Sequence, residues 1–331
     1  MTVGAPLIEL TDIRSARDRL GGAVRRTPLL PAPLPAWGGR PSLEAPDEMW
    51  LKCENLQWVS AFKARGAYNF VSRLTPAERD AGLITYSSGN HAQAVAFAAR
   101  AFGARARIVM PVDAPEVKRH GTRMLGADVE FAGTTSSERK ERAEEIQRLE
   151  GGTMVPPFDH PDIIAGQGTV GLELVEQLGD RRLGLVLVPI GGGGLIAGVA
   201  AAVRGTVPDA RVVGVEPEAA AAMARSLEAG APVTIPGAAT IADGLKPVRP
   251  GDLTFAHCQA LVERVVTVTD DSIRAAVRWL CERRLVVEPS GAATVAALLQ
   301  GAVAPAAHGA TVAVLSGGNI EPTLLAELLA G

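Results

Sequence analysis

Residues 60–67 (SAFKARGA) place one lysine, Lys63, among small and apolar neighbours at a predicted strand-to-helix turn. Loss of solvent disfavours the charged form of an amine and lowers its pKa. A neutral amine attacks a carbonyl carbon and forms a Schiff base, which is how a lysine carries an aldehyde cofactor. A single lysine more often lies along the surface with its ammonium in water. The segment therefore allows Schiff-base chemistry without requiring it.

A second segment, residues 87–91 (SSGNH), follows a predicted strand and is rich in small and polar side chains. Its members are Ser87, Ser88, Gly89, Asn90 and His91. They would lie at the start of the next helix, where several backbone N–H groups have no partner within the helix. Such a turn binds a carboxylate or a phosphate. The same residues also suit a plain capped loop, in which the serines only cap the helix and His91 has no ligand.

Four consecutive glycines lie between a buried apolar strand and an Ala-rich helix, namely Gly191, Gly192, Gly193 and Gly194. Glycine is costly to order, and a simple turn needs only one or two. A run of this kind lets the backbone approach an anion closely, with N–H groups and the helix dipole directed at a phosphate. The run therefore indicates a phosphate-binding loop.

The glycine run also has a second interpretation. Gly192-x-Gly194-x-x-Ala197 fits a relaxed dinucleotide-binding fingerprint, and Glu216 lies at the end of the next strand at the expected distance. A nicotinamide-dependent oxidoreductase would account for these residues. It would give no task to Lys63, and its glycines normally lie in the first strand–helix unit of the nucleotide domain rather than late in the chain.

Residues 316–319 (SGGN) place a hydroxyl, Ser316, at the end of a late strand, where open α/β sheets bind ligands. A phosphate loop, a Schiff-base lysine, a carboxylate-binding turn and a hydroxyl for a ring nitrogen together match one cofactor, pyridoxal phosphate holding an amino acid. The sequence contains no HExxH motif, Cys/His cluster or G-x-S-x-G motif. Metal-dependent and serine hydrolysis therefore have no support.

Short β-branched runs alternate with Ala-rich helical stretches along nearly the whole chain, which predicts an α/β fold with parallel sheets. We predict strands at residues 49–53, 83–87, 106–110, 128–131, 185–189, 211–215 and 310–315. We predict helices over residues 12–20, 61–73, 90–102, 117–125, 137–149, 163–177, 195–204, 271–284 and 292–299. The capping box Thr75-Pro76-Ala77-Glu78 starts a further helix.

Length and chain breaks predict two domains. The 331 residues correspond to two units, at roughly 100–200 residues per domain. The capping box and the Pro-Pro pair at 156–157 mark the breaks. The simplest organisation is a small α/β domain over residues 76–155, inserted into a larger cofactor-binding domain formed by residues 1–75 and 156–331.

Composition excludes several classes of protein. With 47% hydrophobic and 21% charged residues, the chain can build a large core and is not intrinsically disordered. A net charge of -3 and only 4% aromatic residues argue against a nucleic-acid partner. No run approaches the roughly 18 apolar residues of a membrane span, and the N-terminus has no secretory signal pattern. Because Cys53, Cys258 and Cys281 are widely spaced, we expect reduced thiols in a cytoplasmic protein.

The motifs occur in an order that resembles a known family. Residues 241–244 (IADG) and 287–289 (VEP) join the four segments described above. The whole set resembles the fold-type II pyridoxal-phosphate enzymes, specifically the threonine/serine dehydratase and serine racemase branch. The resemblance covers essentially the whole chain and implies a tryptophan synthase β-like α/β fold with two open parallel-sheet domains. Cysteine synthases share that fold, but their lysine and asparagine segments differ.

The resemblance also implies roles for individual residues. Lys63 would carry pyridoxal phosphate as a Schiff base and later move the Cα proton of the substrate, with Ser88 as the other catalytic residue. The other cofactor contacts would be Phe62, Asn90, Gly191, Gly192, Gly193, Gly194, Leu195, Gly244, Glu288 and Ser316. The substrate carboxylate would be surrounded by Ser87, Ser88, Gly89, Asn90 and His91.

The implied reaction is β-elimination by an ammonia-lyase, which converts L-threonine, L-serine or a related β-hydroxy amino acid to a 2-oxo acid and ammonia. A neutral Ser316 hydroxyl does not stabilise a protonated ring as an aspartate would, which favours prompt loss of the β-hydroxyl. Racemisation stays open, because racemase-like members use a serine at the position of Ser88 as acid/base on the opposite face. A specialised dehydratase for 3-hydroxyaspartate or phenylserine stays open too, as does a catalytically silent binding protein.

Three departures from the family pattern matter. Ala61 stands where the family often has serine. The divalent-metal site of racemase-like members would fall on Glu216, the carbonyl of Ala220, and Ala222, where a carboxylate is usual. We therefore expect no metal, because hard cations depend on charged oxygen ligands. Only residues 320–331 follow Asn319, so we expect no C-terminal regulatory domain and no isoleucine feedback through one. The family suggests a homodimer.

Overall fold

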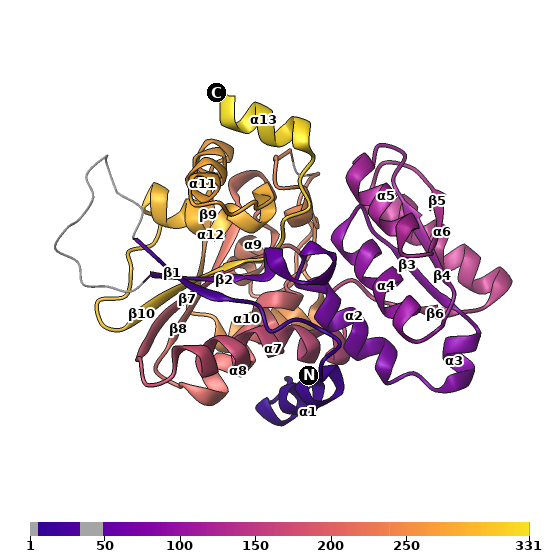
Figure 1. Cartoon of the computed structure of the whole chain (residues 1–331), viewed down its shortest axis with the longest axis horizontal. Helices are drawn as coiled ribbons and strands as arrows, with labels where there is room; N and C mark the ends of the chain where they lie inside the picture. Colours follow the sequence, from indigo (N-terminus) through magenta and orange to yellow (C-terminus); the bar gives the residue numbers. More distant parts are fainter. Residues whose placement is uncertain (1–5, 34–48, 238, 331) are drawn as a thin grey trace.

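The computed structural model describes residues 6–33, 49–237 and 239–330, which form two open sheets covered by helices (Figure 1). The larger sheet has the strand order β1-β2-β10-β7-β8-β9. Its strands are β1 (Leu29–Ala32), β2 (Met49–Cys53), β10 (Ala310–Leu315), β7 (Leu183–Pro189), β8 (Arg211–Pro217) and β9 (Arg264–Val268). Every neighbouring pair is parallel except β1 with β2, which is antiparallel.

The smaller sheet is entirely parallel, with the strand order β5-β4-β3-β6. Its strands are β5 (Asp128–Phe131), β4 (Ala106–Met110), β3 (Leu83–Tyr86) and β6 (Thr153–Met154). Both sheets match the predicted α/β class. The predicted strands at 49–53, 106–110, 128–131 and 310–315 are confirmed to the residue, whereas β1, β6 and β9 were not predicted.

The helices alternate with the strands along the chain. They are α1 (Leu10–Leu20), α2 (Lys63–Ser72), α3 (Pro76–Asp80), α4 (Asn90–Ala101), α5 (Glu116–Met124), α6 (Ser136–Glu150), α7 (Pro161–Leu178), α8 (Gly194–Thr206), α9 (Ala222–Ala229), α10 (Asp252–Leu261), α11 (Asp270–Glu282), α12 (Pro289–Gln300) and α13 (Pro322–Ala330). Short 3-10 turns are η2 (Glu54–Leu56), η3 (Trp58–Ser60), η4 (Glu218–Ala220) and η5 (Asp243–Leu245). The predicted capping box opens α3, where Thr75 and Glu78 cap each other's backbone N–H groups.

The central strand β7 divides the core into two layers. Leu185 and Leu187 pack with apolar side chains of α11 and α12 on one face of the sheet. Val186 and Val188 pack with those of α7 and α8 on the other face. Successive side chains of a strand point to opposite faces, so a continuous apolar run belongs to a strand that is buried on both sides. This burial holds the carboxyl end of β7, where the glycine run begins, in a rigid setting.

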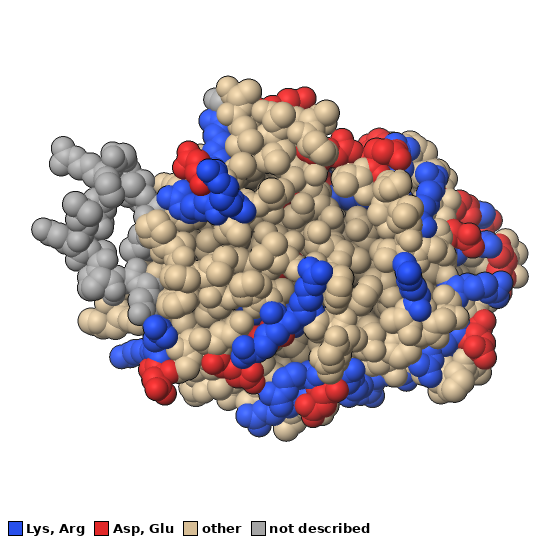
Figure 2. Space-filling view, in the orientation of Figure 1, with Lys and Arg blue, Asp and Glu red and all other residues tan. Residues whose placement is uncertain are grey.

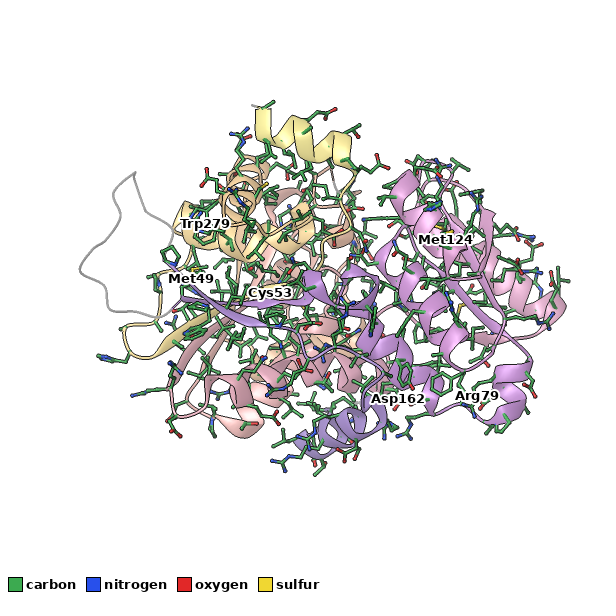
Figure 3. The ribbon with its side chains drawn as sticks, in the orientation of Figure 1. Met49, Cys53, Arg79, Met124, Asp162 and Trp279 are labelled. Atoms are coloured by element: carbon green, nitrogen blue, oxygen red, sulfur yellow. The ribbon has the colours of Figure 1, made fainter. Side chains whose placement is uncertain are left out.

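Helix α2 connects the two parts of the molecule. Its Phe70 and Val71 belong to the apolar cluster of the smaller sheet. Its C-terminal half is tied to the start of α7, because Asn69 Nδ2 donates to the Asp162 carbonyl at 2.7 Å and Arg73 Nε lies 3.0 Å from the Asp162 carboxylate. Figure 3 labels Asp162 beside this junction. The smaller sheet lies within residues 76–155, and we propose these bounds for the inserted domain, with α2 packed against it.

The start of α2 differs from the prediction. The predicted helix over 61–73 begins only at Lys63. Val59 and Ser60 have φ values of 54° and 52°, in the left-handed region, and Ala61 pairs as an isolated bridge with Gly317. Backbone strain of this kind persists only where surrounding contacts hold it. The chain therefore turns sharply just before Lys63 and presents this lysine on the first turn of the helix.

Charges on the surface are mixed. Figure 2 shows Lys and Arg side chains interspersed with Asp and Glu on the face in view, around a broad uncharged area over the larger sheet. Within the described ranges, no helix is both long and apolar enough to cross a membrane.

Candidate active site

Lys63 lies on the first turn of α2, beside the segment that follows β10. The backbone N–H of Phe62 donates to the carbonyl of Ser316 at 3.1 Å, and Ala61 bridges to Gly317. These contacts place the lysine segment directly against residues 316–319. Two segments that are more than 240 residues apart in the sequence therefore meet at the carboxyl edge of the larger sheet.

The amine of Lys63 is poorly solvated, and no acidic side chain in the described part of the chain pairs with it. The side chain is half-buried, and its Nζ donates to the carbonyl of Pro157 at 2.6 Å. Burial lowers the pKa of Lys63 to about 8. A substantial fraction of this amine is therefore neutral near physiological pH, as a carbonyl-attacking nucleophile and a proton carrier both require.

The glycine run forms a narrow turn that excludes side chains. Gly193 has a φ of 95°, and a Cβ on it would lie 2.8 Å from the Thr254 side chain. A Cβ on Gly192 would lie 2.3 Å from the ring of Phe158. Thr254 Oγ1 also donates to the carbonyl of Gly192 at 2.7 Å. Neighbouring side chains thus fix the loop, and glycine is required here for space as well as for conformation.

The N–H groups of the loop are available to a ligand. No acceptor among the described residues takes the backbone N–H of Gly192, Gly193, Gly194 or Leu195. These groups lie at the start of α8, where the helix dipole favours a negative charge. A phosphate group is the anion that such a loop suits best. The glycine run therefore fits the phosphate group of pyridoxal phosphate, the cofactor predicted from the sequence.

The serine segment forms the start of α4. Ser87 Oγ accepts the Gly89 N–H at 3.1 Å, while the hydroxyl of half-buried Ser88 has no hydrogen-bond partner among the described residues. The ring of His91 is buried, and its Nε2 lies 3.1 Å from the Val155 carbonyl. Burial and the nearby charge of Lys63 lower the pKa of His91 to about 3, so its ring is neutral. The His91 side chain is thus occupied by Val155, whereas Ser88 is open to a ligand.

Asn90 connects the serine segment to two others. Its Nδ2 donates to Glu288 Oε1 at 2.5 Å, and its Oδ1 accepts from Asn319 Nδ2 at 2.9 Å. Asn319 also donates to the carbonyl of Val59, next to the lysine segment. Nearby Ser316 is 4% exposed, and its hydroxyl has no partner among the described residues. A neutral hydroxyl in this position suits an unprotonated ring nitrogen.

One buried lysine reaches the site from the smaller domain. Lys118 Nζ contacts the Asp243 carboxylate and lies 3.4 Å from Glu288 Oε2. Its stem crosses Gly89, because a Cβ on that glycine would lie 2.3 Å from Lys118 Cδ. Burial raises the pKa of Glu288 and outweighs the opposing effect of Lys118. Gly244, next to Asp243, donates its N–H to Ser290 Oγ at 2.8 Å.

The structure brings all six predicted segments together. The contacts that join them are Ala61 with Gly317, Asn319 with Asn90, Asn90 with Glu288, Ser290 with Gly244, and Gly244 with Gly191. The residues that sequence reasoning missed are Lys118, Pro157, Phe158 and Thr254. Each acts through a contact with a distant segment, and nothing in its local sequence separates it from an ordinary surface or core residue.

Comparisons with known proteins agree with this geometry. A family model described as "Pyridoxal-phosphate dependent enzyme" matches residues 20–317. An L-threonine ammonia-lyase from Thermotoga maritima is 42% identical over 325 residues, covering 98% of this chain and 78% of that protein. The T.th. threonine deaminase superposes with a TM-score of 0.86 at 41% identity, covering 95% of this chain and 99% of that chain. Maize serine racemase gives a TM-score of 0.89 at 35% identity, covering 98% of each chain.

The matches decide between the two interpretations of the glycine run. They assign it to the pyridoxal-phosphate enzymes, so the alternative of a nicotinamide-dependent oxidoreductase is wrong. The resemblance stated from the sequence is confirmed, as is the fold with two parallel-sheet domains. The chain belongs to the pyridoxal-phosphate-dependent enzymes of fold type II, in the branch of threonine dehydratases and serine racemases.

Proposed function

We propose that this protein is a pyridoxal-phosphate-dependent ammonia-lyase that converts L-threonine, L-serine or a related β-hydroxy amino acid to a 2-oxo acid and ammonia. One observation carries the proposal. Direct contacts join the segments that carry three features: the poorly solvated amine of Lys63, the N–H groups of the glycine run, and the hydroxyls of Ser88 and Ser316. Among the described residues, neither these N–H groups nor these hydroxyls have a hydrogen-bond partner. The similarity to threonine ammonia-lyases supports the same reaction.

The residues divide the work of binding. The N–H groups of Gly192, Gly193, Gly194 and Leu195 would hold the phosphate of the cofactor at the start of α8. Gly191 and Gly244 would close the turn beneath it, and Phe62 would flank the ring. Ser87, Ser88 and the N-terminus of α4 would hold the carboxylate of the amino acid. Ser316 would pair with the ring nitrogen, and Asn90, backed by Glu288, would face the ring oxygen.

Proton transfer falls to Lys63. When bound, pyridoxal phosphate withdraws electrons from the Cα of an attached amino acid, which makes the Cα proton acidic and a β-hydroxyl able to leave. With a pKa of about 8, the Lys63 amine can take that proton near neutral pH and release it again in a later step of the reaction. The neutral Ser316 hydroxyl stabilises negative charge on the ring less than a charged partner would, which favours elimination over a long-lived carbanion.

Borohydride trapping tests the proposal. Reduction of the purified protein, followed by peptide mass mapping, should place the cofactor on Lys63, and Lys63→Ala should release neither ammonia nor 2-oxo acid from L-threonine or L-serine. The control variant is Lys140→Ala, which changes an exposed lysine on α6 that pairs with Glu144. A protein that stays colourless and unlabelled when supplied with pyridoxal phosphate would contradict the proposal.

Racemisation is a second candidate activity, and it is supported by the Ser88 hydroxyl, which no described residue engages in a hydrogen bond. A hydroxyl on the opposite face of the substrate from Lys63 would let Cα receive a proton from that face, which inverts its configuration. We expect Ser88→Ala to spare elimination from the L-isomer while removing racemisation and action on the D-isomer. Chiral chromatography of serine measures both products. Unchanged turnover of D-serine by Ser88→Ala would show that this serine does not serve the opposite face.

We also propose a cytoplasmic homodimer that takes a small-molecule amino acid as substrate. The three cysteines are free thiols in the structure, as a reducing compartment would keep them. Leu56 and Trp58 expose 41% and 42% of their surface on adjacent turns, and exposed apolar groups of this size suit a subunit contact. Analytical ultracentrifugation measures the association state.

A further inference from the structure

Glu216 is a fully buried carboxylate outside the site described above. It lies near the end of β8, and both of its oxygens are used by the first turn of α9. Oε1 accepts the Met223 N–H at 2.9 Å, and Oε2 accepts the Ala224 N–H at 2.9 Å. Backbone N–H groups at a helix start lack partners within the helix, and a negative charge there is favoured by the helix dipole. Glu216 therefore caps α9 from a neighbouring strand.

The family resemblance implies a divalent cation at this place, but the residues present do not fit one. The cation would need Glu216, the Ala220 carbonyl and a carboxylate at position 222. Position 222 is a fully buried alanine, and the Glu216 oxygens are already engaged. Among the residues that the structure describes, no group of three or more His, Cys, Asp or Glu side chains could hold a metal ion. A hard cation takes six to eight oxygen ligands, several of them charged.

The capped helix start packs directly on the glycine run. Met223, whose N–H is held by Glu216, is fully buried. A Cβ on Gly193 would lie 2.9 Å from Met223 Cε and 2.8 Å from Thr254. The Met223 side chain therefore supports the turn of the run from one side, next to the Thr254 hydroxyl that donates to the Gly192 carbonyl. A chain of contacts leads from Glu216 through Met223 to the N–H groups of the loop.

We propose that Glu216 is a positioning residue for the phosphate loop, which it supports as an internal cap of α9 without a bound cation. The carboxylate holds the start of α9, α9 holds Met223, and Met223 holds Gly193. Binding of pyridoxal phosphate by this enzyme is then independent of Ca²⁺, Mg²⁺ and Mn²⁺. This inference rests on the proposed function only in assigning the glycine run to the phosphate of the cofactor.

The first test adds and removes cations. The Kd for pyridoxal phosphate, from fluorescence titration of the stripped full-length protein, and the Tm of the holoenzyme are measured in EDTA and in millimolar CaCl₂, MgCl₂ or MnCl₂. We expect both values to be the same in every solution. A saturable rise in Tm or a saturable fall in Kd with any of these cations would overturn the proposal.

The second test changes the cap. In Glu216→Gln the amide oxygen still accepts one N–H, but the amide nitrogen faces the other, which leaves a buried donor unsatisfied. We expect pyridoxal phosphate to bind about tenfold more weakly, with normal far-UV circular dichroism. The matched control is Glu218→Gln, an exposed glutamate on η4. Met223→Ala, which removes the contact with Gly193 but keeps the cap, should weaken binding in the same direction. Equal Kd values for Glu216→Gln and Glu218→Gln would show that Glu216 does not position the loop.

If the parent protein itself takes no pyridoxal phosphate at Lys63, the proposed function fails. If the parent binds it but the Glu216→Gln protein binds it equally well, only the present inference fails.

Discussion

The lowered pKa of Lys63 comes from the removal of water around its amine rather than from a neighbouring charge. Burial is the single cause that lowers its pKa to about 8. The lysine of the cofactor-free protein should therefore be about a tenth neutral at pH 7 and about nine tenths neutral at pH 9. Competitive acetylation with peptide mass mapping measures this as a labelling rate that rises through pH 8 and then levels off.

The exposed Lys140 serves as the reference in the same digest. Lys140 corrects for differences in reagent and digestion between samples. If the labelling of Lys63 did not level off above pH 8, the desolvation argument would be wrong. Addition of pyridoxal phosphate before acetylation should protect Lys63 and leave Lys140 labelled.

The small and apolar neighbours of Lys63 in the chain made it a candidate, and the resemblance to a known family gave it a role. The same holds for Gly193, since four successive glycines indicate by themselves a turn that excludes side chains. Sequence reasoning missed Phe158 and Thr254, whose side chains leave no room for a Cβ on those glycines. It also missed Lys118, which reaches the site from the other domain. Such partners are fixed by packing between distant segments, and their local sequence carries no sign of it.

At the scale of elements, a buried network of charges anchors α2. The Arg65 guanidinium, fully buried, donates to Glu54 on η2 and to Glu173 on α7, with N–O distances of 2.7–2.8 Å. Lys52 on β2 donates to Glu173 at 2.7 Å. Two positive and two negative side chains thus meet two residues after Lys63. The network joins the helix that carries Lys63 to both the larger sheet and α7.

Arg65→Met should lower the free energy of unfolding by about 3–5 kcal/mol, because it leaves two buried carboxylates with one cation between them. Arg65→Lys keeps the charge but cannot span both carboxylates, so we expect a smaller loss. Urea unfolding followed by tryptophan fluorescence measures both. A loss no larger than that of Lys140→Met, an exposed reference, would contradict the anchoring role.

The same network gives a pH dependence. Burial alone would raise the pKa of Glu54, but Arg65 and its hydrogen bonds lower it below the usual value. A carboxylate with a lowered folded pKa contributes stability that is complete above its unfolded pKa, about 4.3, and is lost as pH falls through the folded value. The difference in stability between the parent and Arg65→Met should therefore be constant near neutral pH and shrink in acid.

Elements were predicted where their own pattern sufficed. Strand β10 is rich in β-branched and apolar residues and is buried on both faces, and its bounds agree with the prediction. Strand β1 is short, contains Pro31 and lies at the antiparallel edge of the sheet, whereas β6 has two residues. Neither carries a periodic signal, since both owe their pairing to a partner strand. The start of α2 was predicted two residues too early, because the left-handed turn at Val59 and Ser60 contains no glycine that would indicate it in the sequence.

At the scale of the whole molecule, a buried ion pair joins the two domains across the site. Lys118 lies on α5 of the smaller domain, while Asp243 and Glu288 belong to the larger part. A further contact between the parts is the Glu116 N–H, which donates to Glu321 Oε1 at 2.6 Å. The side chain of Lys118 is 3% exposed and that of Glu288 is 1% exposed, so this pair is shielded from water. Because solvent does not screen this pair, we expect its removal to lower the free energy of unfolding.

Lys118→Met should lower the free energy of unfolding by about 3 kcal/mol, because Glu288 then stays buried without a cation. Burial already raises the pKa of Glu288, and without Lys118 the folded pKa moves further above the unfolded value. A carboxylate with a raised folded pKa loses stability as pH increases, so the deficit should be small near about pH 5 and larger near about pH 8. Adding Glu288→Gln should recover most of the loss, since no buried charge is then left unpaired while the amide oxygen still accepts from Asn90. Urea unfolding at both pH values, with Lys140→Met as reference, measures the effect, and a deficit independent of pH would mean that Lys118 contributes packing rather than charge.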